Sequence, residues 1–311
     1  MIGVFKQKGI LLILLIFHSR FTIGQSLATY DEFDGTNLNT TFWNTQQSFG
    51  PNINTDNDKQ IFRSQNVALD AGKLKLFLKE EPGCYDTWRF CDSADCHSDC
   101  SKKYLDPACN SPARCQVSGS HCFCLVPKHF QYTAGMIVSA EKFHYGIFEI
   151  KCKIPKDCQS AFWLYGDCCS EIDVFEFLGC EEDKASITIH KCPAKDCHNT
   201  NLQCGQNFKG FKNSPKTDFS KDFHTWKLDW KAEGISIYVD EQLIFHCKAN
   251  GLGACLYNTF NLTGGSCTIG THTLYPNGEM NLILNIATNP NDCLPPTPSE
   301  MEIEYVKVWQ Y

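Results

Sequence analysis

The amino-acid sequence predicts an all-β fold in which two antiparallel sheets pack as a sandwich. Three observations lead to this prediction. Apolar and polar residues alternate with a period of two over several short segments, clusters of Gly, Asn, Asp and Pro separate these segments, and the pattern of a long capped amphipathic helix is missing. The 311 residues fit one large domain, since a single β-sandwich can extend to this length.

The alternation is clearest in three segments, which are predicted to be strands. They are residues 73–79, 146–154 and 235–240. The same pattern predicts further strands at residues 136–139, 185–190, 225–230, 280–287 and 301–309. The sequence contains no evident internal repeat, so these strands are expected to belong to one domain, residues 26–311.

One segment departs from this pattern. Residues 81–125 contain eight cysteines, few apolar residues and no clear strand. We predict a cysteine-rich insertion held by disulfide bonds, between a strand that ends near Lys79 and one that begins near Tyr132. Eight cysteines allow 105 pairings, and the sequence favours none of them.

Residues 1–25 have the features of a cleaved signal peptide. Lys6 and Lys8 precede an apolar run from Ile10 to Phe17, and a polar stretch follows. Because a membrane-spanning helix needs about 20 apolar residues, we expect no membrane anchor. The mature protein is therefore predicted to be secreted and extracellular.

The cysteine content agrees with secretion. The chain has 20 cysteines at irregular spacings and no Cys-x-x-Cys pair, which favours a disulfide framework over zinc ligands. Two glycosylation sequons, beginning at Asn39 and Asn261, fit the same route. The formal net charge of −7, without a block of basic residues, argues against a nucleic-acid partner.

The most informative segment is residues 171–177, with the sequence EIDVFEF. It carries three carboxylates among four bulky apolar residues, and its alternation holds from 171 to 174 and then breaks. A β-bulge at Val174 and Phe175 would restore the alternation and place Glu171, Asp173 and Glu176 on one face of the strand. Bulges of this kind are common beside active sites.

Two glutamates on one face at this spacing suit the cleavage of a glycosidic bond. Their Cα atoms would lie about 13 Å apart, so side chains that lean together can reach the roughly 5 to 5.5 Å of retaining glycosidases. One carboxylate then attacks the anomeric carbon while the other protonates the leaving oxygen, and Asp173 would help to keep one of them neutral. The alternative is a solvent-exposed acidic strand, although such strands usually mix acids with Thr, Ser and Lys.

The segment EIDVFE resembles the E-x-D-x-x-E active-site pattern of glycoside hydrolase family 16, in its laminarinase-like branch of endo-β-1,3-glucanases. Further segments resemble other blocks of this family in matching order. They are DEFDG at 31–35 with Phe42 and Trp43, YGIFEIKCKIP at 145–155, AFWL at 161–164, FHTW at 223–226, IYVD at 237–240, LILNIA at 282–287 and EYVKVWQY at 304–311. Laminarinases usually carry Trp-Pro and a Gly before the first catalytic Glu, whereas this chain has GDCCS at 166–170, which leaves the substrate open.

The resemblance implies a β-jelly-roll whose concave sheet forms a cleft for a polysaccharide. It implies that Glu171 is the nucleophile, Glu176 the general acid/base and Asp173 the residue that supports the nucleophile. The resemblance also implies that the cleft contains Trp163 as a sugar platform, with His190 and Asn285 as polar cleft residues. For these last three, a packed or satisfied structural role is an equal alternative.

Several members of the resembled family hold a structural calcium ion between the first and last strands. By position, this resemblance implies ligands at Glu32, Gly72 and Glu304. The cleavage chemistry itself requires no cofactor.

The leading hypothesis is a secreted retaining endo-hydrolase of a β-linked glucan, with β-1,3 or mixed β-1,3/1,4 bonds. Three alternatives stay open at this point. They are a glucan transglycosylase that uses the same carboxylates, a galactan hydrolase acting on agar or carrageenan, and a non-catalytic glucan-recognition protein. The expected partner is the polysaccharide substrate, and we expect a monomer.

Overall fold

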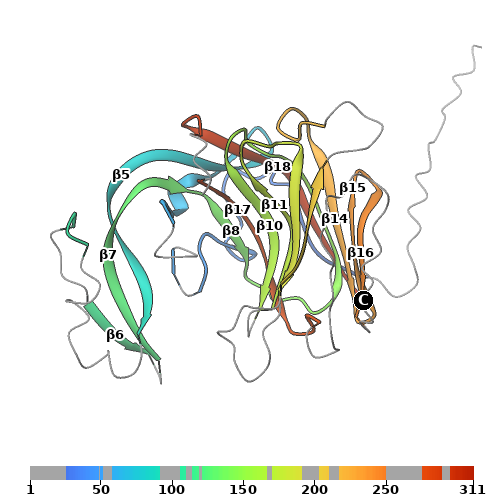
Figure 1. Cartoon of the computed structure of the whole chain (residues 1–311), viewed down its shortest axis with the longest axis horizontal. Helices are drawn as coiled ribbons and strands as arrows, with labels where there is room; N and C mark the ends of the chain where they lie inside the picture. Colours follow the sequence, from blue (N-terminus) through green and yellow to red (C-terminus); the bar gives the residue numbers. More distant parts are fainter. Residues whose placement is uncertain are drawn as a thin grey trace, which may run out of the picture.

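Two sheets packed face to face form the body of the protein (Figure 1), which confirms the predicted all-β jelly-roll sandwich. The computed structural model describes residues 26–48, 50–51, 58–91, 106–109, 114–118, 121–166, 170–190, 203–209, 217–249, 275–288 and 295–311. The signal-peptide prediction, residues 1–25, lies outside these residues and stays a prediction. Asn39 is exposed, as glycosylation requires, whereas Asn261 lies outside the described residues.

The larger of the two sheets has 11 strands in the described part of the chain. Its main path runs β16 (Gln242–Lys248), β15 (Gly234–Val239), β14 (His224–Lys231), β9 (Gly146–Lys153), β18 (Ser299–Gln310), β5 (Lys73–Cys91), β7 (His121–Ala134) and β3 (Gln60–Phe62). Three more strands pair beside this path, β1 (Ser26–Asp31) with β18, β4 (Val67–Asp70) with β5 and β6 (Arg114–Ser118) with β7. A short 3₁₀ helix, η1 (Ser64–Asn66), precedes β4.

The smaller sheet carries the acidic segment. Its order is β13 (Gln203–Lys209), β12 (Lys184–His190), β11 (Glu171–Leu178), β10 (Gln159–Gly166), β17 (Met280–Ala287), β8 (Met136–Ser139) and β2 (Trp43–Asn44). The predicted strands at 136–139 and 280–287 match β8 and β17, and those at 146–154, 185–190, 225–230, 235–240 and 301–309 lie within two residues of observed strands at both ends. The strand predicted at 73–79 begins where β5 begins, but β5 continues beyond the predicted end to Cys91. Five strands separate β17 from β11 in sequence order, yet only β10 lies between them in the sheet.

The core lies between the two sheets. Residues of β9 alternate strictly between buried and partly exposed, as the period of two predicted. Trp226 of β14 bridges the layers, because its ring lies 4.8 Å from the Phe175 ring and 5.9 Å from the Phe177 ring of β11. Phe219 packs against both Phe177 and Trp226. The bulky apolar residues of the acidic segment therefore hold the sheets together.

The prediction that residues 81–125 contain no strand is wrong. β5 and β7 continue far beyond the sandwich and pair with each other from Leu78–Ala134 to Cys91–Cys122. Together with β6 they form a hairpin arm that projects from the body (Figure 1). Pro82 made this segment look irregular, but it falls where the register shifts, between Glu80 and Gly83, so its missing N–H costs no regular ladder bond.

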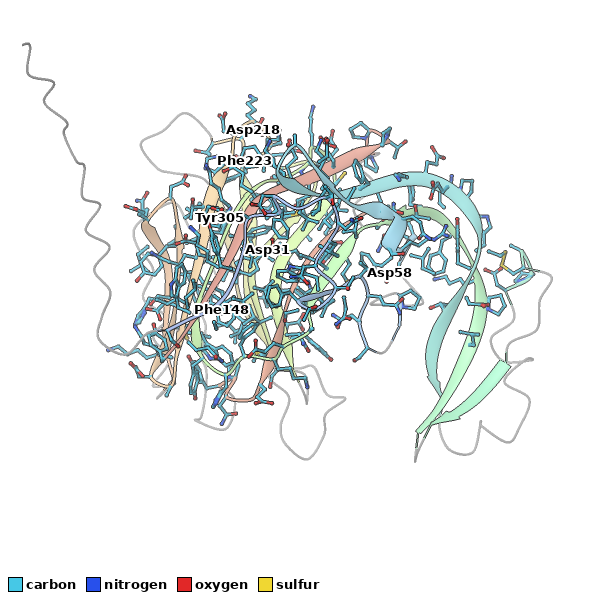
Figure 2. The ribbon with its side chains drawn as sticks, turned by 180° about the vertical axis from the view of Figure 1, so that it is seen from behind. Asp31, Asp58, Phe148, Asp218, Phe223 and Tyr305 are labelled. Carbon is cyan, nitrogen blue, oxygen red and sulfur yellow. A yellow bond between two sulfur atoms is a disulfide. The ribbon has the colours of Figure 1, made fainter. Side chains whose placement is uncertain are left out.

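Contacts at its base fix the arm to the rest of the chain. Lys128 of β7 donates a hydrogen bond to the carbonyl oxygen of Asp58, which lies between the body and the arm (Figure 2). The guanidinium of Arg63 lies over the ring of Tyr85, 5.1 Å from its centroid. These contacts tie the arm to the segment that contains β3 and η1.

The disulfide prediction is confirmed in part. Cys84 and Cys109 form a disulfide bond at the arm, and Cys180 is also disulfide-bonded. Cys152 and Cys158 instead keep buried thiols, so the framework does not include every cysteine. Burial raises the pKa of the Cys158 thiol to about 11, which keeps it protonated and unreactive near neutral pH.

Within the described ranges, no helix has the length and apolar character that crossing a bilayer requires.

Candidate active site

The predicted β-bulge is present in β11. Its register with β10 steps from the pair Phe162–Phe175 to the pair Trp163–Asp173, so Val174 is the extra residue. The register with β12 shifts at the same place, between Asp173 and Glu176. The bulge prediction is therefore confirmed, and it resets which side chains share a face of the strand.

The bulge places the three carboxylates on one face of the smaller sheet. Residues directly opposite each other on neighbouring strands share a face. Glu176 is opposite Ala161, Asp173 opposite Trp163, and Glu171 opposite Tyr165. We call this side of the smaller sheet the carboxylate face.

The two glutamates and the aspartate differ in burial. Glu171 and Glu176 are partly exposed, whereas the neighbouring apolar residues Ile172 and Phe175 are fully buried. Asp173, between the glutamates, is only 3% exposed. Two accessible carboxylates therefore flank a buried third one, and substrate can reach only the outer two directly.

The surroundings of Asp173 change its protonation. Burial raises its pKa well above the ordinary value, and the negative charge of Glu176 raises it further. The neutral form of Asp173 thus persists to higher pH, and a protonated carboxyl can donate a hydrogen bond to a neighbouring carboxylate. This behaviour agrees with the supporting role expected for Asp173, which stays a prediction.

Gln159 is a neighbour of Glu176 that the sequence analysis missed. Its Nε2 lies 3.5 Å from Oε1 of Glu176. The sequence contains part of the information that predicts this contact, because alternation along β10 places Gln159 on the same face as Ala161 and Trp163. The neighbouring strand, however, could not be paired with β11 from sequence alone.

The structure brings Trp163 and Asn285 together. The indole Nε1–H of Trp163 donates a hydrogen bond of 2.8 Å to Oδ1 of Asn285, and both side chains are buried. The Tyr165 ring meets the Trp163 ring edge to face at 5.7 Å. The polar atoms of these two candidates are therefore used within the protein, and sugar stacking on Trp163 stays a prediction.

His190 lies opposite Glu171 in the register of β12 with β11. The backbone thus places this residue in the same row as the predicted nucleophile. Its side chain lies outside the described part of the structure, so its predicted role in the cleft stays a prediction. Residues 167–169 of the shortened loop before Glu171 also lie outside it.

The residues expected to bind calcium do not fit that ion. Oε2 of Glu304 lies 2.7 Å from Nζ of Lys151, and an ammonium group at this distance competes with a cation. Gly72 occupies the turn between β4 and β5, and Glu32 is exposed. Calcium takes six to eight oxygen ligands, and the described residues contain no cluster of three or more His, Cys, Asp or Glu side chains that could hold a metal. We therefore assign no step to a metal.

A two-sheet jelly roll that presents two accessible glutamates around a buried aspartate defines the class of this protein. It is a glycoside hydrolase that acts on the O-glycosyl bonds of a polysaccharide. The model of glycosyl hydrolases family 16 matches residues 54–259, more than half of the chain, and the chain belongs to this family.

Similar proteins agree with this assignment. A glucan endo-1,3-beta-glucosidase of Cryptopygus antarcticus is 26% identical over 202 residues, which cover 58% of this chain and 68% of that protein. The laminarinase catalytic domain of Thermotoga maritima has the same fold, with a TM-score of 0.62, 19% identity and coverage of 92% of this chain and 98% of that one. The endo-beta-1,3-glucanase of Pyrococcus furiosus gives a TM-score of 0.63 at 20% identity, with 92% and 94% coverage.

Proposed function

We propose that this protein is a secreted, retaining endo-glycosidase that hydrolyses a β-linked glucan with β-1,3 or mixed β-1,3/1,4 bonds. The observation that carries the proposal is the bulged strand β11, which puts Glu171 and Glu176 on one face with Asp173 between them. The linkage is suggested by the relatives, whose names specify endo-1,3-beta-glucosidase and laminarinase activity.

The proposed reaction has two displacements. Glu171 attacks the anomeric carbon and forms a covalent glycosyl-enzyme, while the carboxyl proton of Glu176 goes to the leaving oxygen. Glu176 then takes a proton from water, whose oxygen attacks the anomeric carbon and releases Glu171. Asp173 supports the side chain of the nucleophile Glu171 and helps to keep one of the neighbouring carboxyl groups neutral.

Secretion is part of the proposal. The predicted signal peptide of residues 1–25 supports it, and so does the Cys84–Cys109 disulfide, since such bonds persist in oxidising compartments. Expression of the full chain in a secreting host should release protein into the medium. N-terminal sequencing should find a start near residue 26, and retention in the cytosol would contradict this part of the proposal.

The activity test measures new reducing ends on laminarin, mixed-linkage glucan, xyloglucan, agarose and carrageenan. We expect cleavage of laminarin or mixed-linkage glucan, and loss of nearly all turnover in Glu171→Gln, because the amide cannot attack the anomeric carbon. Glu279→Gln is the matched control, since Glu279 is exposed and lies outside the carboxylate face. Normal turnover in Glu171→Gln would remove Glu171 as the nucleophile.

Product analysis tests the mechanism and the alternatives. Proton NMR during cleavage should show the β-anomer first, as two displacements require. Azide should partly rescue Glu176→Ala on an activated substrate, because a small anion can attack the glycosyl-enzyme without base assistance. Products longer than the substrate would instead indicate a transglycosylase, cleavage of agarose or carrageenan a galactan hydrolase, and binding without turnover a recognition protein.

A further inference from the structure

The turn before β2 displays Asn39, which begins one of the two glycosylation sequons, on the surface of the protein. Asn39, Thr40 and Thr41 are all exposed. The backbone N–H groups of Phe42 and Trp43 both donate to the carbonyl oxygen of Asn39, each at 3.0 Å. The sequon therefore lies in a hydrogen-bonded, solvent-accessible turn, where a glycan can be attached.

Hydrogen bonds on both sides fix the position of the Asn39 side chain. Its Oδ1 accepts a hydrogen bond of 3.0 Å from the backbone N–H of Thr41. Trp43, directly after the turn, is buried, and its indole Nε1–H donates a hydrogen bond of 2.8 Å to Oδ2 of Asp31, which is labelled in Figure 2. The amide is thus engaged through its oxygen, whereas its nitrogen, the atom that bonds to a sugar, belongs to an exposed side chain beside a buried anchor.

Phe42 is an exposed aromatic ring next to the sequon, with 40% of its surface accessible. Tyr30 and Tyr311 are also exposed, but each has a lysine ammonium 5.1 Å from its ring centroid. Phe42 has no such partner among the described residues. Its apolar surface is therefore left in contact with water, which is unfavourable in proportion to the area.

The turn brings Phe42 within reach of a sugar on Asn39. The hydrogen bond from the Phe42 N–H to the Asn39 carbonyl closes a β-turn, whose first and fourth Cα atoms lie within about 7 Å of each other. A pyranose has an apolar face of C–H groups, and packing this face on the Phe42 ring would remove apolar area of both groups from water.

We propose that Asn39 carries an N-linked glycan in the secreted protein and that the innermost N-acetylglucosamine packs its apolar face on the Phe42 ring. The donor is a lipid-linked oligosaccharide. A bond forms between Nδ2 of Asn39 and the anomeric carbon of the sugar, the bond from that carbon to the lipid pyrophosphate breaks, and Nδ2 loses one proton. This inference rests on the proposed secretion and is independent of the glucanase activity.

The first experiment tests attachment of the glycan. The full chain is expressed in a secreting eukaryotic host, and peptide mass spectrometry is done before and after a peptide N-glycosidase, which converts a glycosylated Asn to Asp. We expect sugar on Asn39 in the wild type and in Thr40→Ala, and none in Thr41→Ala, because only the third position of the sequon requires a hydroxyl. Secreted wild-type protein with an unmodified Asn39 would overturn the proposal and leave the glucanase function intact. Retention in the cytosol would overturn secretion and the glycan together.

The second experiment tests the contact with Phe42. One sample is trimmed by an endoglycosidase that leaves a single N-acetylglucosamine on Asn39, and another is stripped completely by the peptide N-glycosidase. We expect the trimmed protein to melt at the temperature of the fully glycosylated one, and the stripped protein to melt about 2–4 °C lower.

Phe42→Ala should abolish the difference between the trimmed and stripped forms. The Asp that the enzyme leaves at position 39, and any sugar on Asn261, are common to both backgrounds, so the comparison cancels their effects. Leu27→Ala is the matched control, because Leu27 is also an exposed apolar residue but lies on β1, and it should keep the difference. Equal melting temperatures of the trimmed and stripped wild type, or an unchanged difference in Phe42→Ala, would overturn the packing of the sugar on Phe42.

Discussion

The position of Asp173 in the fold disfavours the charged form of its carboxyl group. Its folded pKa lies above its ordinary value because of burial and, second, because of Glu176. The folded state therefore binds more protons than the unfolded state above the ordinary pKa of Asp. By linkage, this group lowers stability progressively as pH rises from that value toward its folded pKa.

Asp173→Asn should therefore stabilise the fold while it impairs catalysis. Asn carries no charge, so the melting temperature of the variant should exceed that of the wild type at pH 7, and the difference should shrink toward pH 4. Thermal unfolding followed by circular dichroism between pH 4 and pH 8 measures this difference. A gap that widens on acidification would contradict the raised pKa of Asp173.

The Trp163–Asn285 hydrogen bond makes a second prediction about single residues. Trp163→Phe removes the indole donor and leaves the buried Oδ1 of Asn285 without that bond, at a cost of about 1–3 kcal/mol. The double variant with Asn285→Leu should cost less than the sum of the two single variants, because neither partner is then left alone. Urea unfolding of all three gives the coupling, and strict additivity would show that the bond contributes nothing.

Strand β11 shows how one extra residue sets the chemistry of an element. Without Val174 as an extra residue, the alternation would place Phe175 on the carboxylate face and Glu176 in the core. The core side of the strand is occupied by Phe175 and Phe177, which pack against Trp226. Packing of these rings against the larger sheet therefore stabilises the same bulge that directs Glu176 outward.

The start of β9 depends on a glycine. Gly146 has φ +135°, and a Cβ there would lie 2.4 Å from the carbonyl oxygen of Trp309 on β18. Gly146→Ala should cost about 3 kcal/mol, since both the backbone conformation and the contact oppose it. Gly278→Ala is the matched control, because a Cβ there meets no atom within 4 Å. Chemical denaturation should separate the two variants, and equal costs would refute the strain at Gly146.

Packing between the two sheets stabilises the whole molecule, and a substitution of Trp226 tests how much this packing contributes. Trp226 is 1% exposed and contacts aromatic rings from the opposite sheet. Trp226→Ala should cost about 3–5 kcal/mol of unfolding free energy through the cavity that it leaves. Trp309→Ala should cost clearly less, because Trp309 is partly exposed. Comparable losses in urea unfolding would show that Trp226 does not join the layers.

The fold was predictable where residues alternate on one buried face. β9, β14 and β15 could be predicted because each has one apolar face directed at the core. The hairpin arm could not be predicted, because β5 and β7 leave the core and Pro, Gly and Cys obscure their pattern. An arm of this kind is held by pairing with its neighbour, and pairing between distant segments leaves little trace in local sequence.

The sequence by itself determined the sandwich class, the acidic strand and its bulge, because each is a local pattern of apolar and charged residues. The tertiary structure alone decided what surrounds those carboxylates. The pairing of β10 with β11 brings Gln159 to Glu176, and the pairing of β10 with β17 joins Trp163 to Asn285. These contacts join residues far apart in the chain, so the physical reason lies in strand order and register, which local alternation does not specify.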